Sequence, residues 1–181
     1  MMVAIVVILA ATVSVFSLGF ADDITRPGPL VGQSSGELLA FQDGSDEQIV
    51  RITHIAGDSI TVSNIEISVR AECKDGMKQG RIVNLPAEDG NDIDENDDGL
   101  SQIEGDNIFS GRSLKTIDNN VDGVSNGGAL LHGDGQYAAG ESIIFRISKG
   151  DCEIATGGQV TVRIVHTPTN SVVIKETLTA T

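Results

Sequence analysis

Two patterns of hydrophobic and polar positions divide the chain. Residues 1–20 are apolar on nearly every side, and none of them is ionisable. A helix of twenty residues is about 30 Å long, which matches the hydrocarbon core of a bilayer. Because a helix without a polar face must be surrounded by lipid or by protein, the pattern predicts a buried hydrophobic α-helix over residues 1–20.

Three roles are open for this helix: a cleaved secretory signal, a permanent membrane anchor, or a helix that packs inside a protein assembly. A secretory signal is disfavoured because no basic residue precedes the apolar run, although Gly19, Phe20 and Ala21 resemble a weak cleavage site. Hydropathy does not separate the other two roles. Ala10 and Ser14, four residues apart, would let two helices approach closely.

From residue 47 onward, hydrophobic and polar residues alternate with a period of two. Val50 and Ile52 alternate with Arg51 and Thr53, and the stretches NIEISVR, SIIFRIS, QVTVRIVH and SVVIKETL repeat the pattern. Such alternation is typical of strands with one buried face. Turn residues such as Gly-Asp and Thr-Pro-Thr-Asn separate the runs. We therefore expect an all-β, antiparallel, immunoglobulin-like sandwich.

The sequence predicts three consecutive regions: the helix, a linker and the sandwich. The Pro- and Gly-rich residues 21–36 are expected to be a linker between the helix and the sandwich, which would occupy residues 37–181. Within the sandwich, residues 86–140 are acidic and rich in Gly, and no basic residue lies between Arg81 and Arg112. We expect long exposed loops there.

Composition narrows the function. The chain has 181 residues, a net charge of -14, and 12 Lys and Arg against 26 Asp and Glu. This charge opposes binding to nucleic acid and to anionic lipid headgroups, which require basic surfaces. The acidic, Lys-poor composition is typical of proteins that stay soluble in concentrated salt, so we expect a halophilic source. Only 3% of residues are aromatic, so Val, Ile and Leu should fill the core.

The two cysteines, Cys73 and Cys152, lie 79 positions apart, without the close spacing of a zinc or redox motif. If the domain lies outside the cell, a structural disulfide between them is expected. Two unrelated buried thiols are the alternative.

Three stretches resemble the archaeal type IV pilins, in particular those of halophilic archaea. MVAIVVILAATVSVFSLGF resembles the hydrophobic helix of that family, and ITHIAGDSITVSNIEISV resembles the first strands of its globular domain, with His54, Gly57 and Asp58 at its His-Gly-Asp turn. AAGESIIF, KGD and VTVRIVHTPTNSVVIKETL resemble its closing strands. Together they cover residues 2–20, 47–70 and 138–178.

The resemblance implies a structural subunit of an extracellular pilus that serves adhesion. The helix would be held in the membrane first and then pack with its copies in a helical filament, and the sandwich would face solvent at the cell surface. A prepilin peptidase and pilus assembly machinery are implied partners. The implied filament-core residues are Ile5, Ile8, Leu9, Ala10, Val13, Ser14 and Phe16.

Family members carry a short basic leader and further apolar helix, so Met1 is expected to lie inside the helix of the family. The alternative function is a membrane-anchored monomeric surface domain that binds calcium or another ligand.

Two short motifs match the start of a calcium loop, in which alternate side chains supply oxygen ligands before a Gly. Both lack the acidic twelfth residue of a full loop, because Gly105 and Ala129 stand there, although Glu104 lies one residue early in the first. The alternative is that Asp, Asn and Gly form ordinary turns. The possible ligands are Asp94, Asn96, Asp98, Glu104, Asp118, Asn120 and Asp122.

Catalysis is not expected, and the chain has no nucleophile motif of the P-loop or Gly-x-Ser-x-Gly type. GDGQYA matches a dinucleotide-binding pattern only formally, because it lacks the neighbouring strand and helix that such binding needs. His54 and His166 are expected at strand ends and His132 in a loop, without the spacing of zinc ligands.

Overall fold

The computed structural model describes residues 27–39, 47–86, 103–106, 108–109, 120–121, 124–125 and 135–181. The helix predicted over residues 1–20, with its filament-core residues, lies outside them. Within the described ranges, no helix has the length and apolarity needed to cross a membrane.

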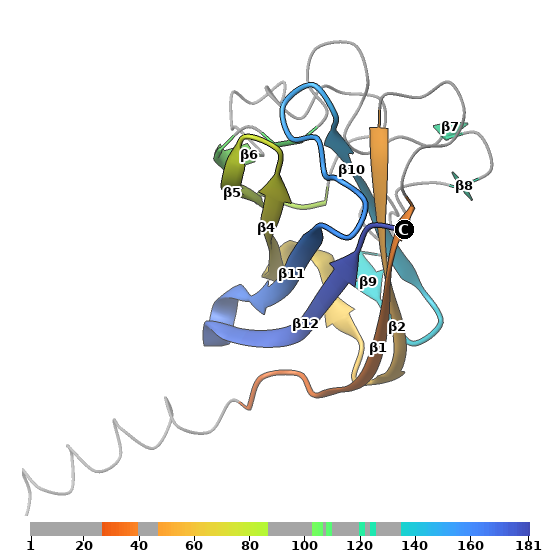
Figure 1. Ribbon diagram of the computed structural model, residues 1–181. Coiled ribbons are helices and arrows are strands. Elements are labelled where there is room, and N and C mark those ends of the chain that lie inside the picture. The colour runs from red at the N-terminus through yellow and green to blue at the C-terminus, as the bar shows by residue number, and fades with distance from the viewer. Residues whose placement is uncertain are drawn as a thin grey trace, which may run out of the picture.

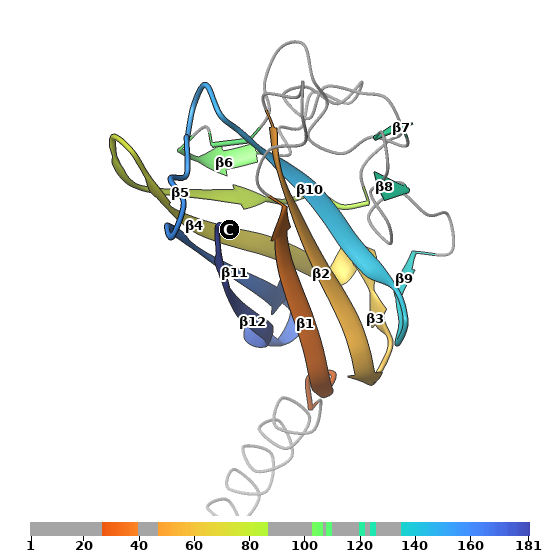
Figure 2. The same ribbon diagram turned by 45° about the vertical axis from the view of Figure 1, so that its right-hand side comes forward.

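Two antiparallel sheets form a sandwich, which confirms the all-β prediction (Figure 1). One has the order β1-β2-β10, and the other has the order β12-β11-β4-β5-β6. Figure 2 shows the strands of the first sheet crossing those of the second at a steep angle. The strands of the two sheets are β1 (Val31–Leu39), β2 (Glu47–Gly57), β10 (Ser142–Ser148), β12 (Ser171–Thr179), β11 (Gln159–His166), β4 (Ile65–Cys73), β5 (Gly76–Ile82) and β6 (Ile103–Gly105).

Short elements complete the described chain. Two pairs of short strands and two 3-10 turns lie between the longer strands, and each strand pair is antiparallel. These elements are β3 (Ile60–Thr61) with β9 (Gln136–Tyr137), β7 (Asn120–Val121) with β8 (Val124–Ser125), η1 (Val62–Asn64) and η2 (Thr167–Thr169).

The core lies between the two sheets and follows the alternation in the sequence. On β4, residues Ile65, Ile67 and Val69 are buried, while the residues between them face outward. Val162 and Ile164 do the same on β11. Most of the core is therefore aliphatic, as the composition suggests, because β-branched side chains pack well on a pleated surface.

The first strand begins inside the expected linker, so the boundary at residue 36 is wrong. β1 starts at Val31 and pairs with β2 up to Leu39. Gly36 lies where β1 crosses β12, and a Cβ atom there would be 3.1 Å from Glu176 Cβ and would also meet the Leu178 side chain. The stretch carries small and polar residues because another strand passes so closely, and this removes the hydrophobic alternation that marks a strand.

The expected exposed loops at 86–140 also need correction. β6 adds a fifth strand to the larger sheet, and Ile108, Phe109 and Tyr137 are fully buried. Phe109 forms a bridge with Ile147 and packs edge-on against Phe145, with ring centroids 6.0 Å apart. A lone apolar pair in a polar stretch has no periodicity, so the sequence pattern does not predict its burial.

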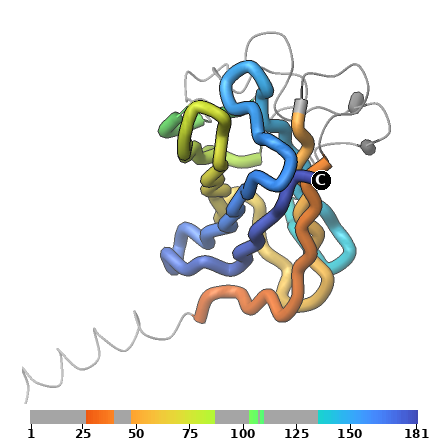
Figure 3. Tube along the Cα trace, in the orientation of Figure 1, coloured from red at the N-terminus to blue at the C-terminus, as the bar shows by residue number. Residues whose placement is uncertain are grey.

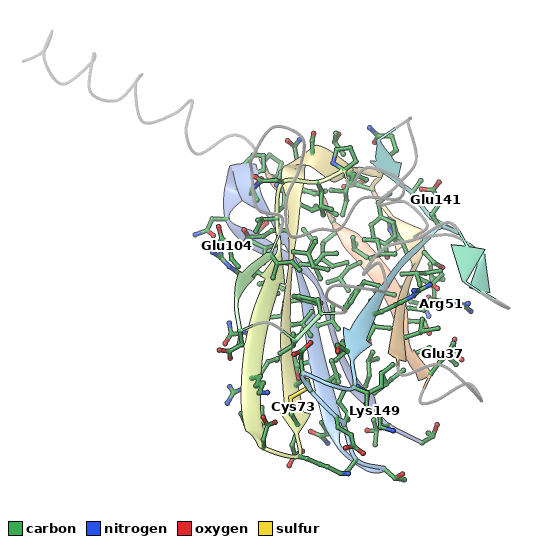
Figure 4. All side chains as sticks on the ribbon, turned by 90° about the horizontal axis from the view of Figure 1, so that it is seen from above. Glu37, Arg51, Cys73, Glu104, Glu141 and Lys149 are labelled. Atoms are coloured by element: carbon green, nitrogen blue, oxygen red, sulfur yellow. A yellow bond between two sulfur atoms is a disulfide. The ribbon has the colours of Figure 1, made fainter. Side chains whose placement is uncertain are left out.

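A disulfide joins Cys73, at the end of β4, to Cys152, which follows β10 (Figure 4). It thereby links β4 of the larger sheet to the connection between β10 and β11. The buried side chain of Gln48 holds the backbone around Cys152. Its Nε2 donates to the Cys152 carbonyl at 2.8 Å, and its Oε1 accepts from the Ile154 amide at 2.9 Å. The pair expected from the sequence is present.

Candidate functional site at the base of the sandwich

The chain joins the sandwich at one end, which we name the base: residues 27–30, the β2–β3 turn at Asp58, and the β11–β12 connection. Two hydrogen bonds hold Leu30 against Asp58. The Leu30 amide donates to Asp58 Oδ2 at 2.9 Å, and the Asp58 amide donates to the Leu30 carbonyl at 2.9 Å. The chain is therefore fastened as it starts β1.

Gly57 makes this approach possible. Its φ of +135° belongs to a region that L side chains rarely adopt, and a Cβ atom would lie 2.8 Å from the Gly32 amide nitrogen. Only glycine fits both the conformation and the space. The Gly-Asp dipeptide predicted as a turn thus has a second role, which is to receive the incoming chain.

The other side of the base is formed by the β11–β12 connection, which lies beside the start of the described chain in Figure 3. A Cβ atom on Gly28 would be 2.8 Å from both Thr169 Oγ1 and Ser171 Oγ. These two hydroxyls are hydrogen-bonded to each other at 2.7 Å, and Thr169 Oγ1 also lies 2.7 Å from His166 Nδ1. Residues 27–30 therefore contact both sheets of the sandwich.

The position of His54 corrects the expectation that it lies at a strand end. It is fully buried within β2, the central strand of its sheet. Its Nδ1 lies 3.4 Å from the Tyr137 carbonyl, and among the described residues its Nε2 has no hydrogen-bond partner. Even-numbered residues of β2 face the core, and His54 continues the series of Val50 and Ile52. His166 does end β11, as expected, and His132 lies outside the described residues.

Tyr137 packs on His54, with ring centroids 5.3 Å apart, and its hydroxyl donates to the Ile52 carbonyl at 3.0 Å. Burial raises the pKa of Tyr137 well above its usual range, and the negative charges of Glu176 and Glu141 add to this effect. The phenol thus stays neutral and acts as a structural donor. Sequence reasoning did not single it out, because its burial depends on β9 pairing with β3.

Of the possible calcium ligands, Glu104 lies on β6 at the sheet edge, as Figure 4 shows. Its carboxylate pairs with Arg81, which also contacts Glu66 Oε1 at 3.3 Å. Asn120 is the first residue of β7. In the described part of the chain, no group of three or more His, Cys, Asp or Glu could hold a metal ion. The remaining candidates lie outside the described residues: Asp94, Asn96, Asp98, Asp118 and Asp122.

No protein-family model matches the chain, and a search of curated proteins finds no match either.

Proposed function

We propose that the protein is a structural subunit of an extracellular, type IV pilus-like filament that serves surface adhesion. Residues 1–20 form a helix that lies in the membrane before assembly and packs among the helices of identical copies afterwards. The immunoglobulin-like sandwich is carried outside this helical core and faces solvent.

The apolar sequence of residues 1–20 supports this proposal, because lipid and a bundle of like helices are both apolar surroundings. One segment can therefore occupy each in turn. The net charge of -14 arises entirely after residue 21, as expected of a domain that stays hydrated while its helix is buried. The Cys73–Cys152 disulfide suits an oxidising environment outside the cytoplasm.

The observation that carries the proposal is the fastening of the chain at the base. Leu30 is bonded to Asp58 and Gly28 lies against Thr169, so the segment that follows the apolar stretch is held by both sheets. A force applied along residues 27–30 would act on the base of the sandwich. The hydrogen-bonded pairing of β1 with β2 begins close to this point. A polymer built through an amino-terminal helix needs such a joint between helix and domain.

Electron microscopy of material sheared from cells that make the protein, with mass spectrometry of the subunit, tests the proposal. We expect filaments composed of this chain. Val13→Lys should abolish them, because a charge would be buried among apolar helices. Val172→Lys, at a position 53% exposed on the sandwich, should leave them intact. Recovery of the unmodified chain only from detergent-solubilised membrane would instead support an anchored monomer and overturn the proposal.

A further inference from the structure

Three exposed cations gather on the outer face of the larger sheet, although acidic residues outnumber basic ones in the chain by 26 to 12. They are Arg70 on β4, Arg163 on β11 and Lys175 on β12, and we name them the basic triad. Arg163 and Lys175 are direct partners in the β11–β12 register. Arg70 pairs with Thr161, two residues before Arg163, and so lies diagonally from it.

The triad faces solvent because its neighbours along each strand face the core. Val69 and Ala71 flank Arg70 and are buried, as are Val162 and Ile164 on either side of Arg163. All three cations are exposed. Side chains directly opposite on one face of an antiparallel pair are only about 5 Å apart at Cβ, and like charges there destabilise the sheet.

No described carboxylate forms an ion pair with any member of the triad. Two glutamates share this face of β4. Glu66 already pairs with Arg81, and Glu72, two residues beyond Arg70, is exposed. Arg81 also pairs with Glu104, so Arg81, Glu66 and Glu104 together carry one negative charge on this face. With Glu72 set against the three cations as well, one positive charge remains, concentrated at the triad. Such a surface attracts an anionic partner.

The chain itself contains a complementary anion. Residues 88–98 carry seven carboxylates and no basic residue. In the sequence, β5 precedes this segment and β6 follows it. In the sheet, β5 lies beside β4, which carries Arg70, whereas β11 and β12, which carry Arg163 and Lys175, lie on the other side of β4. The sheet order places β5 about three strand spacings, roughly 14 Å, from β12.

We propose that the basic triad of one subunit docks the acidic segment 88–98 of a neighbouring copy. This inference rests on the proposed function, which brings identical copies together. Subunits with a net charge of -14 repel one another, and local attraction between complementary surfaces opposes this repulsion. The triad and the acidic segment are different parts of one chain, so each copy can give one contact and receive another.

Carbodiimide cross-linking tests the contact, since it joins the Lys175 amine to a carboxylate that touches it. Unlabelled and heavy-isotope-labelled full-length chains are mixed in detergent, concentrated, cross-linked and digested. We expect Lys175 joined to a residue of 88–98, with about half of the links between differently labelled copies in an evenly mixed sample. Lys74 and Glu153, 2.6 Å apart in one chain, supply a same-label control link.

Two variants sharpen the test. Arg70→Gln with Arg163→Gln keeps Lys175 as the probe and should lower the yield of its link about three- to tenfold. Arg51→Gln with Lys149→Gln removes equal charge near the other sheet, where Figure 4 labels both residues, and should leave the yield unchanged. Salt at about 1 M should also weaken the link, because the screening length then falls to roughly 3 Å.

Absence of the Lys175 link while the control link forms would overturn the inference, as would links confined to single labels. Equal yields from both double variants would do the same. The proposed function is tested separately: filaments on cells without the Lys175 link would remove only the inference, and the link without filaments would remove only the proposed function.

Discussion

Leu30 and Asp58 exchange two hydrogen bonds, each of 2.9 Å, where the chain joins the sandwich. One of them uses the Asp58 carboxylate, so it can be removed without altering the backbone. Asp58→Ala should lower the free energy of unfolding by about 1 kcal/mol. It should also speed hydrogen exchange at the Leu30 amide, while the more conservative Asp58→Asn retains a side-chain oxygen acceptor and most of the protection. Unchanged exchange at Leu30 in the Ala variant would contradict the fastening.

We expect alanine substitutions at Gly36 and Gly32, both in β1, to differ sharply in their effect on stability. Gly36→Ala should destabilise the fold by about 1–3 kcal/mol, because its methyl group would press on Leu178 and Glu176. Gly32→Ala is the matched control, since its Cβ would lie 3.6 Å from the nearest atom, the Ala56 carbonyl oxygen. Urea unfolding measures both. Equal stability of the two variants would show that β1 does not cross β12 so closely.

The Cys73–Cys152 disulfide closes a loop of 79 positions between β4 and the β10–β11 connection. Replacing both cysteines with Ala should lower the free energy of unfolding by about 2–4 kcal/mol, mainly because the unfolded chain gains freedom. Denaturant unfolding gives this difference. Intact mass of the unmodified protein before and after reduction is the control, and detection of two free thiols without reduction would contradict the pairing.

Tyr137 predicts a loss of stability in alkali. Its pKa is raised in the folded protein, so its contribution is complete below the unfolded value of about 10 and is lost as the pH rises beyond it. Above about pH 10, the unfolding free energy of the wild type should fall by up to about 1.4 kcal/mol per pH unit more than that of Tyr137→Phe.

Because Tyr137 is the only tyrosine in the chain, its phenolate absorbance reports this titration directly. The absorbance should appear together with unfolding. Ionisation near pH 10 with the fold intact would show that the ring is not buried.

Several strands could be predicted from the sequence because they are amphipathic. Residues of β4 and β11 alternate between the core and solvent, so the period of two that folding requires is visible in the chain itself. The turn at Gly57 and Asp58 could also be predicted, because Gly and Asp are typical turn residues. Pairing between distant residues leaves no periodic pattern in the sequence. The disulfide is an exception, because the chain has only two cysteines, so Cys73 and Cys152 could pair only with each other.

Tertiary structure decided the features that depend on contacts between distant segments. β1 is a strand, although its glycines remove the alternation by which a strand is recognised. Gly36 is needed there because β12 crosses β1 too closely for a side chain. His54 and Phe109 are buried by partners far along the chain. The meeting of Arg163 with Lys175 follows from the register of two strands. The sequence alone determined an apolar amino-terminal segment and an acidic β domain, since both follow from composition and local periodicity. Which side chains meet across strands and sheets was decided by packing, because it depends on residues far apart in the chain.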